Sequence, residues 1–189
     1  MTLHTVLWIV IILFPISEIS LGIRKRADRS VTRSEDRGSL RLLLSIIAAS
    51  IALAITFQWI RVARLHGSPT GYRALALSLL ISGLAIRWSS IATLGRLFTV
   101  DVAIHRDHTL VESGLYKYIR HPSYTGLLMA FFGLGFSFVN WLSLIVLVVP
   151  ITLAVLNRIS KEEAALREGL GEPYTTYCTR TKRLVPWVI

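Results

Sequence analysis

The chain has 189 residues, of which 53% are hydrophobic and only 17% are charged, and its mean hydropathy is +0.57. Such an apolar composition excludes most water-soluble domains and indicates an integral membrane protein. The formal net charge of +10 is compatible with nucleic acid binding, but the basic residues cluster in the gaps between apolar runs. We therefore expect contacts with anionic membrane lipids and no nucleic acid partner.

Five apolar segments follow one another along the chain and predict membrane-spanning helices. They cover approximately residues 3–23, 42–60, 74–95, 124–139 and 141–156. A helix needs about 20 residues to cross the ~30 Å hydrocarbon core, whereas the last two segments measure about 24 Å each. We expect those two to form a tight helical hairpin joined at Asn140. The predicted fold is all-α, a multi-pass transmembrane bundle of about five spans in a single domain over residues 1–189.

The polar segments predict the smaller elements and the orientation. Residues 24–41 are strongly basic, and residues 99–104 and 109–113 suit a short extended hairpin around HRDH. Residues 157–173 predict a helix that ends at Gly169 or Gly171 and stops at Pro173, before a basic, aromatic tail to residue 189. The polar segments predicted on one side of the membrane carry 17 Lys and Arg residues, and those on the other side carry 3. The positive-inside rule then puts the N-terminus outside and the C-terminus in the cytosol.

The stretch "YKYIRHPSYTG", from Tyr116 to Gly126, precedes the fourth apolar segment. Pro122 suits the first turn of a helix, because its fixed φ is already helical and it needs no amide partner there. Arg120 and His121 would then lie at the positive end of the helix dipole, where a carboxylate or phosphate can bind. The alternative is that Arg and Tyr side chains only anchor the span at the lipid headgroups.

Two further clusters are candidates for chemistry. Arg158 and Glu162 are four residues apart and share a helical face, whereas Glu163 points about 100° away. Carboxylates next to a membrane need partners such as a ribose diol, an ammonium group or an arginine, unless they form a solvated helix face. Arg87 lies inside the third span and either marks a ligand path or snorkels to the interface. Glu18 is expected to pair with another span.

No metal site is expected. His105 and His108 form an H-x-x-H pair without further ligands in pattern, and the chain has a single cysteine. Gly83, Gly133 and Gly135 are expected to allow close helix packing.

Three stretches taken in order resemble the isoprenylcysteine carboxyl methyltransferase family of integral membrane enzymes. They are "RWSSIATLGRLFT" from Arg87, "LVESGLYKYIRHPSYTG" from Leu110 and "RISKEEAALREGLGEPYTTYCTRTKRLVP" from Arg158. A hydrophobic hairpin of the expected size separates the last two, and the likeness covers roughly the C-terminal 100 residues.

This resemblance implies a cytosol-facing pocket for S-adenosylmethionine, with S-adenosylhomocysteine as product, and a lateral route for a lipophilic or lipid-linked substrate. It implies that Arg87, Arg158 and Glu162 serve catalysis, with the arginines orienting an acceptor carboxylate. The implied cofactor-binding residues are Tyr116, Tyr118, Arg120, His121, Pro122, Tyr124, Glu162 and Glu163.

The expected activity is methylation of a lipophilic carboxylate, such as that of an isoprenylcysteine. A weaker resemblance extends to phospholipid N-methyltransferases, which share the Arg-His-Pro and paired-glutamate pattern but alkylate an amine. The non-enzymatic alternative is a small membrane scaffold or transport element whose basic loops bind anionic lipid. The sequence leaves the acceptor, the oligomeric state and the particular membrane open.

Overall fold

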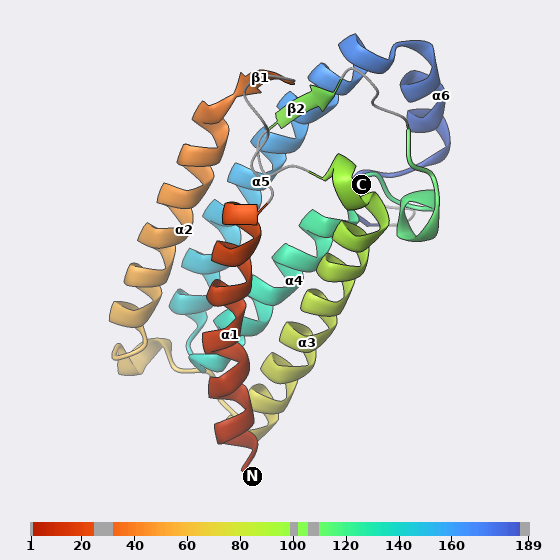
Figure 1. Cartoon of the computed structure of the whole chain (residues 1–189). Helices are drawn as coiled ribbons and strands as arrows, with labels where there is room; N and C mark the ends of the chain where they lie inside the picture. The colour runs from red at the N-terminus through yellow and green to blue at the C-terminus, as the bar shows by residue number, and fades with distance from the viewer. Residues whose placement is uncertain (1, 25–31, 99–101, 106–109, 186–189) are drawn as a thin grey trace.

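The computed structural model describes residues 2–24, 32–98, 102–105 and 110–185. The helices in these ranges are α1 (Leu3–Arg24), α2 (Arg37–Phe57), α3 (Pro69–Leu94), α4 (Pro122–Ser137), α5 (Trp141–Leu170) and α6 (Glu172–Arg180). The strands are β1 (Thr32–Asp36) and β2 (Val102–His105), and 3-10 turns occupy Arg61–Ala63, Gly95–Leu97 and Gly114–Lys117. The first five helices run alternately up and down in one bundle (Figure 1), so the all-α prediction is confirmed.

Four helices are long and apolar enough to cross a membrane in the part of the chain that the structure describes. They cover Leu3–Ile23, Gly38–Phe57, Pro69–Leu97 and Trp141–Leu170. Helix α4 is also apolar but has only 16 residues, which is shorter than a hydrocarbon core requires. Large apolar side chains on the outside of the bundle, among them Ile16, Leu53 and Leu153, are exposed as they would be to lipid. The molecule is therefore a membrane-embedded bundle, and the count of five spans stays a prediction.

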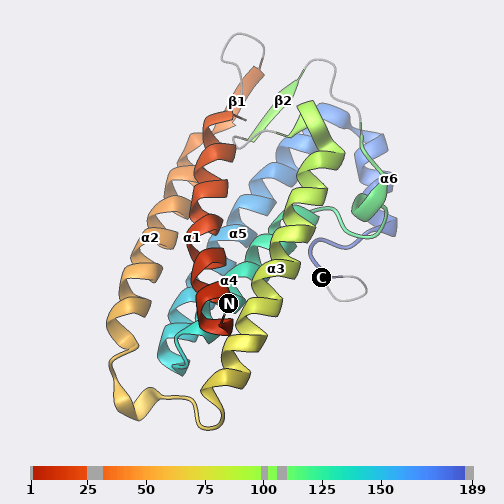
Figure 2. The ribbon, with the colours of Figure 1, turned by 60° about the horizontal axis from the view of Figure 1, so that its bottom comes forward.

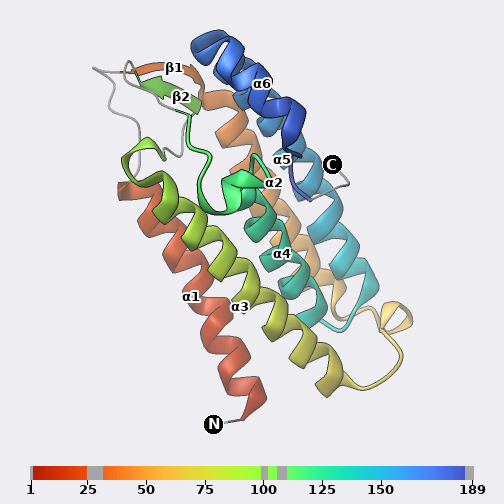
Figure 3. The same ribbon diagram turned by 90° about the vertical axis from the view of Figure 1, so that its right-hand side faces the viewer.

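The C-terminal part is more helical than the sequence suggested. Helix α5 continues without a break past residue 156 to Leu170, so the predicted span and the predicted helix after it are one element. Gly171 ends it with a φ of 64°, a left-handed conformation that favours glycine. Pro173 then lies in the first turn of α6, so part of the predicted tail is helical. Figure 3 shows α6 folding back across the end of α5.

The predicted hairpin of residues 99–104 and 109–113 is wrong in its pairing. Strand β2 pairs antiparallel with β1 from the first polar loop, with Thr32 opposite His105 and a bulge between Ser34 and Asp36. Residues 110–113 form no strand, while residues 99–101 and 106–109, with His108 of the predicted H-x-x-H pair, lie outside the described residues. The ribbon joins the two basic loops at the end of the bundle opposite the N-terminus (Figures 1 and 2).

Helices α3 and α4 approach each other closely through glycines. A Cβ atom on Gly83 would lie 2.6 Å from the carbonyl oxygen of Gly126, and one on Gly133 would lie 2.7 Å from that of Ala76. These distances are shorter than any real contact, so only glycine fits. The prediction of close packing at Gly83 and Gly133 is confirmed, and at Gly135 a Cβ would meet the side chain of Leu144 at 2.6 Å.

Replacing Gly83 by alanine is therefore expected to destabilise the protein. The added methyl group must push α3 away from the α4 backbone, at a cost of about 1–3 kcal/mol. Gly71→Ala is the matched control on the same helix, because its Cβ would meet only the Ser68 side chain, at 3.6 Å. Thermal unfolding in detergent should show a lower melting temperature for Gly83→Ala alone. Equal melting temperatures for the two variants would contradict the close contact.

The far end of the bundle is closed by Asn140, at the predicted hairpin between α4 and α5. Its side-chain oxygen accepts a hydrogen bond from the Ser143 amide at 3.1 Å and so caps α5. Its side-chain nitrogen donates to the carbonyl oxygens of Phe57 at 3.0 Å and Ile60 at 3.2 Å. One side chain thus caps α5 and ties it to the backbone at the end of α2 and in the turn that follows.

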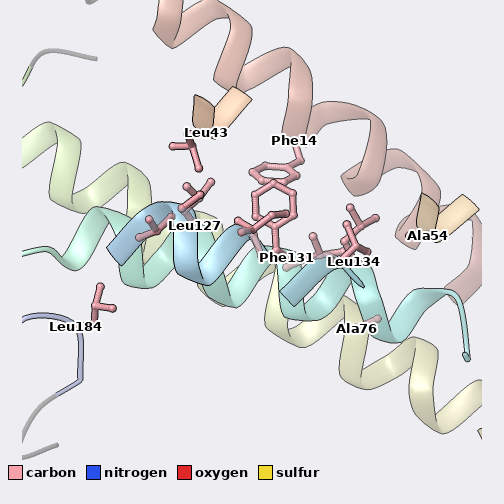
Figure 4. Packing of buried hydrophobic residues seen from close by; sticks show 14 of the residues in the cluster. Phe14, Leu43, Ala54, Ala76, Leu127, Phe131, Leu134 and Leu184 are labelled. Carbon is pink, nitrogen blue, oxygen red and sulfur yellow. The ribbon is translucent and has the colours of Figure 1, made fainter. Parts of the chain in front are cut away.

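The hydrophobic core lies between α1, α4 and the neighbouring helices. Phe14 of α1 packs edge-on against Phe131 of α4, with ring centroids 5.4 Å apart. Figure 4 shows this pair beside Leu43, Leu127 and Leu134. The same helices line the apolar part of the cavity described below.

Candidate functional site

The start of α4 is held in place by the C-terminal tail. Pro122 lies in the first turn and His121 at the N-cap position, as predicted. The amides of Arg120 and His121 donate to the carbonyl oxygens of Lys182 at 2.7 Å and Arg183 at 3.0 Å. The tail therefore runs alongside the Arg-His-Pro stretch and fixes its backbone before any ligand binds.

Glu163 lies at the centre of a cluster of basic side chains. It is 1% exposed, and its oxygens accept hydrogen bonds from Arg120 Nε at 2.9 Å and from Arg183 Nη2 at 2.8 Å. His121 Nε2 lies 3.4 Å and Arg167 Nη2 3.8 Å from the same carboxylate. Arg120 also donates to the carbonyl oxygens of Thr181 and Cys178. Glu163 therefore joins α5, the start of α4 and the tail.

Glu162, the preceding residue of α5, points about 100° away from Glu163 and lines a cavity. The Tyr124 hydroxyl donates to Glu162 Oε2 at 3.0 Å and accepts from Arg158 Nε at 2.9 Å. Arg158 Nη1 donates to Ser39 Oγ of α2 at 2.9 Å. Arg158 and Glu162 share a helical face, as predicted, and Tyr124 bridges them from α4.

Arg87 is paired with Glu18 across the bundle. Arg87 Nε and Nη2 each donate to one oxygen of Glu18 at 2.5 Å, and Nη1 donates to the carbonyl oxygen of Ser123 at 3.1 Å. The expectation that Glu18 pairs with another span is confirmed. Because Arg87 is only 7% exposed and lines the cavity, it does not snorkel to the interface.

One cavity of about 680 Å³ connects these groups. Its polar end is lined by Arg87, Tyr116, Arg120, His121, Tyr124, Arg158 and Glu162. Its apolar part extends between α1, α2 and α4, along Phe14, Leu43, Ile47, Ile51, Leu127 and Phe131. A volume of this size suits a drug-sized ligand or cofactor. The arrangement can hold a polar molecule at one end and an apolar chain at the other.

Three of the predicted cofactor residues lie outside the lining. Glu163 lies behind Arg120, and Pro122 is buried at the helix start. Tyr118 is 56% exposed, with the Lys117 ammonium 5.9 Å from its ring centroid. Its carbonyl oxygen accepts from the Lys182 amide at 3.3 Å, so its backbone helps to hold the tail.

Helix α6 adds residues that sequence reasoning missed. Tyr174 and Tyr177 line the cavity, and the Tyr177 hydroxyl donates to the carbonyl oxygen of Tyr116 at 2.6 Å. Their only signal was the density of tyrosines in the predicted tail. Burial, followed by the negative charge of Glu163, raises the pKa of Tyr174 far above its usual value. Burial, followed by the charge of Glu162, does the same to the pKa of Tyr116. Both hydroxyls therefore remain protonated donors.

One buried polar group beside the cavity, the Tyr174 hydroxyl, has no hydrogen-bond partner among the described residues. His121 Nε2 is buried as well, but it faces the Glu163 carboxylate at 3.4 Å. Buried polar groups are almost always paired, so the free hydroxyl of Tyr174 fits a polar ligand at this end of the cavity. Together with the Glu162 carboxylate, it suits a molecule with hydroxyl and amino groups.

Comparison with known proteins shows that this chain is similar to one family of enzymes. Residues 75–168 match the model of the isoprenylcysteine carboxyl methyltransferase family. Protein-S-isoprenylcysteine O-methyltransferase B of Arabidopsis thaliana is 30% identical over 97% of this chain and 93% of its own length. The Schizosaccharomyces pombe protein-S-isoprenylcysteine O-methyltransferase is 32% identical over 62% of this chain and 50% of its own length.

A solved structure of a eukaryotic intramembrane Ras methyltransferase shares the fold. Its TM-score is 0.61 at 22% identity, over 82% of this chain and 55% of the other. The chain thus spans nearly the whole length of one plant relative and about half of the fission yeast and solved proteins.

Proposed function

Because the chain belongs to the isoprenylcysteine carboxyl methyltransferase family and is a membrane-embedded methyltransferase, we propose that it methylates the carboxylate of an isoprenylated cysteine or a similar lipophilic acid. The observation that carries this proposal is one cavity of about 680 Å³ that has Arg87 and Arg158 at its polar end and continues into an apolar part. A polar cofactor and a lipid-linked acceptor fit the two parts, with their reacting groups side by side.

The proposed methyl donor is S-adenosylmethionine. When bound, it supplies a methyl group on a sulfonium sulfur, and a carboxylate oxygen of the acceptor forms the new C–O bond while the C–S bond breaks and its electron pair stays on sulfur. A carboxylate is already ionised at neutral pH, so the protein needs to position it rather than remove a proton. Arg87, Arg120 and Arg158 line the cavity, and since Arg120 donates to Glu163 and to the tail, we assign the positioning of the acceptor to Arg87 and Arg158.

We assign the proposed cofactor residues by where they lie. Glu162 faces the cavity and would accept hydrogen bonds from the ribose hydroxyls or the ammonium group. Arg120 and His121 would hold the carboxylate end at the start of α4, and the rings of Tyr116 and Tyr124 would pack on the nucleoside. Glu163, Pro122 and Tyr118 would support this site from outside the lining, by orienting Arg120, starting α4 and holding the tail.

The proposed orientation puts the site at the cytosolic face and the N-terminus outside, with residues 1–189 as one domain. Two observations support it. The β1–β2 ribbon brings two basic loops together at the end that carries α6 (Figure 1). The N-terminus lies at the other end, where the connections carry only three basic residues. Membrane lipids are the proposed surroundings.

Calorimetry of the purified protein with S-adenosylhomocysteine tests the proposed cofactor. The wild-type protein should bind it saturably, whereas a scaffold would show no saturable heat. Glu162→Gln should weaken binding about ten- to a hundredfold, because a hydrogen bond to a charged group contributes about 1.5–3 kcal/mol. Glu168→Gln is the control, since Glu168 is exposed on the same helix. Equal affinities for the two variants would remove Glu162 from the site.

Transfer of a labelled methyl group to N-acetyl-S-farnesylcysteine tests the acceptor. A base-labile product is expected, because a methyl ester is cleaved by base. Labelling of membrane lipid in a base-stable form would instead indicate an N-methyl group and a phospholipid amine as acceptor.

A further inference from the structure

Glu18 occupies a position that the proposed reaction leaves unexplained. It is the only acidic residue of α1, and it lies within an apolar span, five residues before its last residue Ile23, where an ionised carboxylate is costly. Its side chain lines the same cavity as Arg87, and 25% of the side-chain surface of Glu18 is exposed against 9% for the Arg87 side chain. Helix α1 thus contributes a carboxylate to the polar end of the cavity.

Glu18 occupies the two N–H groups of Arg87 that a carboxylate ligand would need. Arginine binds carboxylates best through two parallel N–H groups, and both Nε and Nη2 of Arg87 already donate to Glu18. The remaining contact of Arg87 is to the Ser123 carbonyl oxygen, which fixes the guanidinium against the first turn of α4. An acceptor carboxylate can reach the same geometry only if Glu18 leaves.

The position of α1 makes such an exchange feasible. Helix α1 forms one wall of the cavity with Ile11, Phe14 and Pro15, and its large apolar residues on the other side face outward. Pro15 interrupts its hydrogen-bond ladder one turn before Glu18. Among the described residues, the pair with Arg87 is the one ion pair that ties α1 to the other helices. A small movement near Pro15 would release the side chain.

We propose that Glu18 occupies the binding position of the acceptor carboxylate on Arg87 until the acceptor binds, an inference that rests on the proposed function. Without acceptor, Glu18 neutralises Arg87 inside the membrane. The acceptor carboxylate displaces Glu18 and takes over the two N–H groups, so the number of charged hydrogen bonds on Arg87 is unchanged. Methylation removes the negative charge from the acceptor, and Glu18 then regains Arg87 and displaces the ester. Glu18 thereby keeps Arg87 neutralised before and after turnover, and it weakens the binding of the acid, which has to displace it, without affecting a neutral ligand.

The test compares two ligands that differ only in charge, N-acetyl-S-farnesylcysteine and its carboxamide, each bound in the presence of S-adenosylhomocysteine. In Glu18→Gln the competing charge is gone, so the Kd of the acid should fall about tenfold while that of the amide stays the same. The KM for the acid should fall in parallel, whereas inhibition by the uncharged methyl ester should stay the same, as for the amide. The melting temperature and the affinity for S-adenosylhomocysteine serve as checks on folding.

An unchanged or weaker affinity of Glu18→Gln for the acid would overturn the proposal, as would equal shifts for acid and amide. If Glu18→Gln does not fold, Glu18→Asp keeps the charge on a shorter side chain that cannot make both contacts, and a smaller fall in the Kd of the acid alone is expected. No selective fall in that variant would also overturn it. Failure of the wild-type protein to bind S-adenosylhomocysteine or to methylate the acid would instead refute the proposed function.

Discussion

Replacing Glu163 by glutamine is expected to destabilise the protein more than any other single change at the site. Its carboxylate is 1% exposed and neutralises Arg120 and Arg183 together. Removal of one partner from a buried ion pair leaves an uncompensated charge and costs about 3–5 kcal/mol. Since Arg120 and Arg183 belong to the start of α4 and to the tail, both should loosen. Thermal unfolding in detergent measures the loss as a lower melting temperature.

Glu168→Gln provides the control, because it makes the same chemical change at an exposed position five residues further along α5. Its melting temperature should match that of the wild-type protein. Addition of S-adenosylhomocysteine should stabilise the wild-type protein more than Glu163→Gln, since Arg120 and His121 are no longer held in place. If the two glutamine variants had the same melting temperature, the buried cluster would contribute nothing to the stability of the fold.

The two halves of the site could be predicted because each has a strong local pattern. Pro122 marks a helix start from its own ring geometry, and Glu162 and Glu163 diverge because successive helical residues are about 100° apart. Their meeting was expected from the family resemblance, and the contacts from Arg120 to Glu163 and from Tyr124 to Glu162 place them together. The functional roles of these residues stay predictions.

The remaining partners could not be predicted, since they depend on contacts between distant segments. Nothing around Ser39 indicates that its hydroxyl faces Arg158, 119 positions away. The segment of strand β2 was predicted to pair with its neighbour at residues 109–113, whereas it pairs with the distant strand β1. Arg183 lies in a tail whose composition indicates only a basic surface, yet it donates to Glu163. Hydropathy locates helices along the chain but does not specify which polar groups face one another.

Replacing Arg158 by methionine is expected to have the largest effect on turnover. The change keeps an unbranched side chain but removes the guanidinium donors of Arg158, which lie beside Tyr124 and line the cavity. If Arg158 orients the acceptor carboxylate, kcat/KM for N-acetyl-S-farnesylcysteine should fall about 100- to 1000-fold, as for loss of a positioned donor in other active sites. Arg158→Lys should recover only part of the activity, because an ammonium group cannot make the same two directed contacts to Tyr124 and Ser39.

Two controls distinguish this fall in kcat/KM from a loss of folding or of cofactor binding. Arg61→Met removes an exposed arginine from the turn at the far end of the bundle and should leave both kcat/KM and melting temperature unchanged. Arg158→Met should still bind S-adenosylhomocysteine, because Glu162, Arg120 and His121 are retained. A fall in cofactor affinity as large as the fall in kcat/KM would assign Arg158 to the cofactor rather than to the acceptor. Near-normal turnover would leave Arg87 as the only guanidinium group proposed to orient the carboxylate.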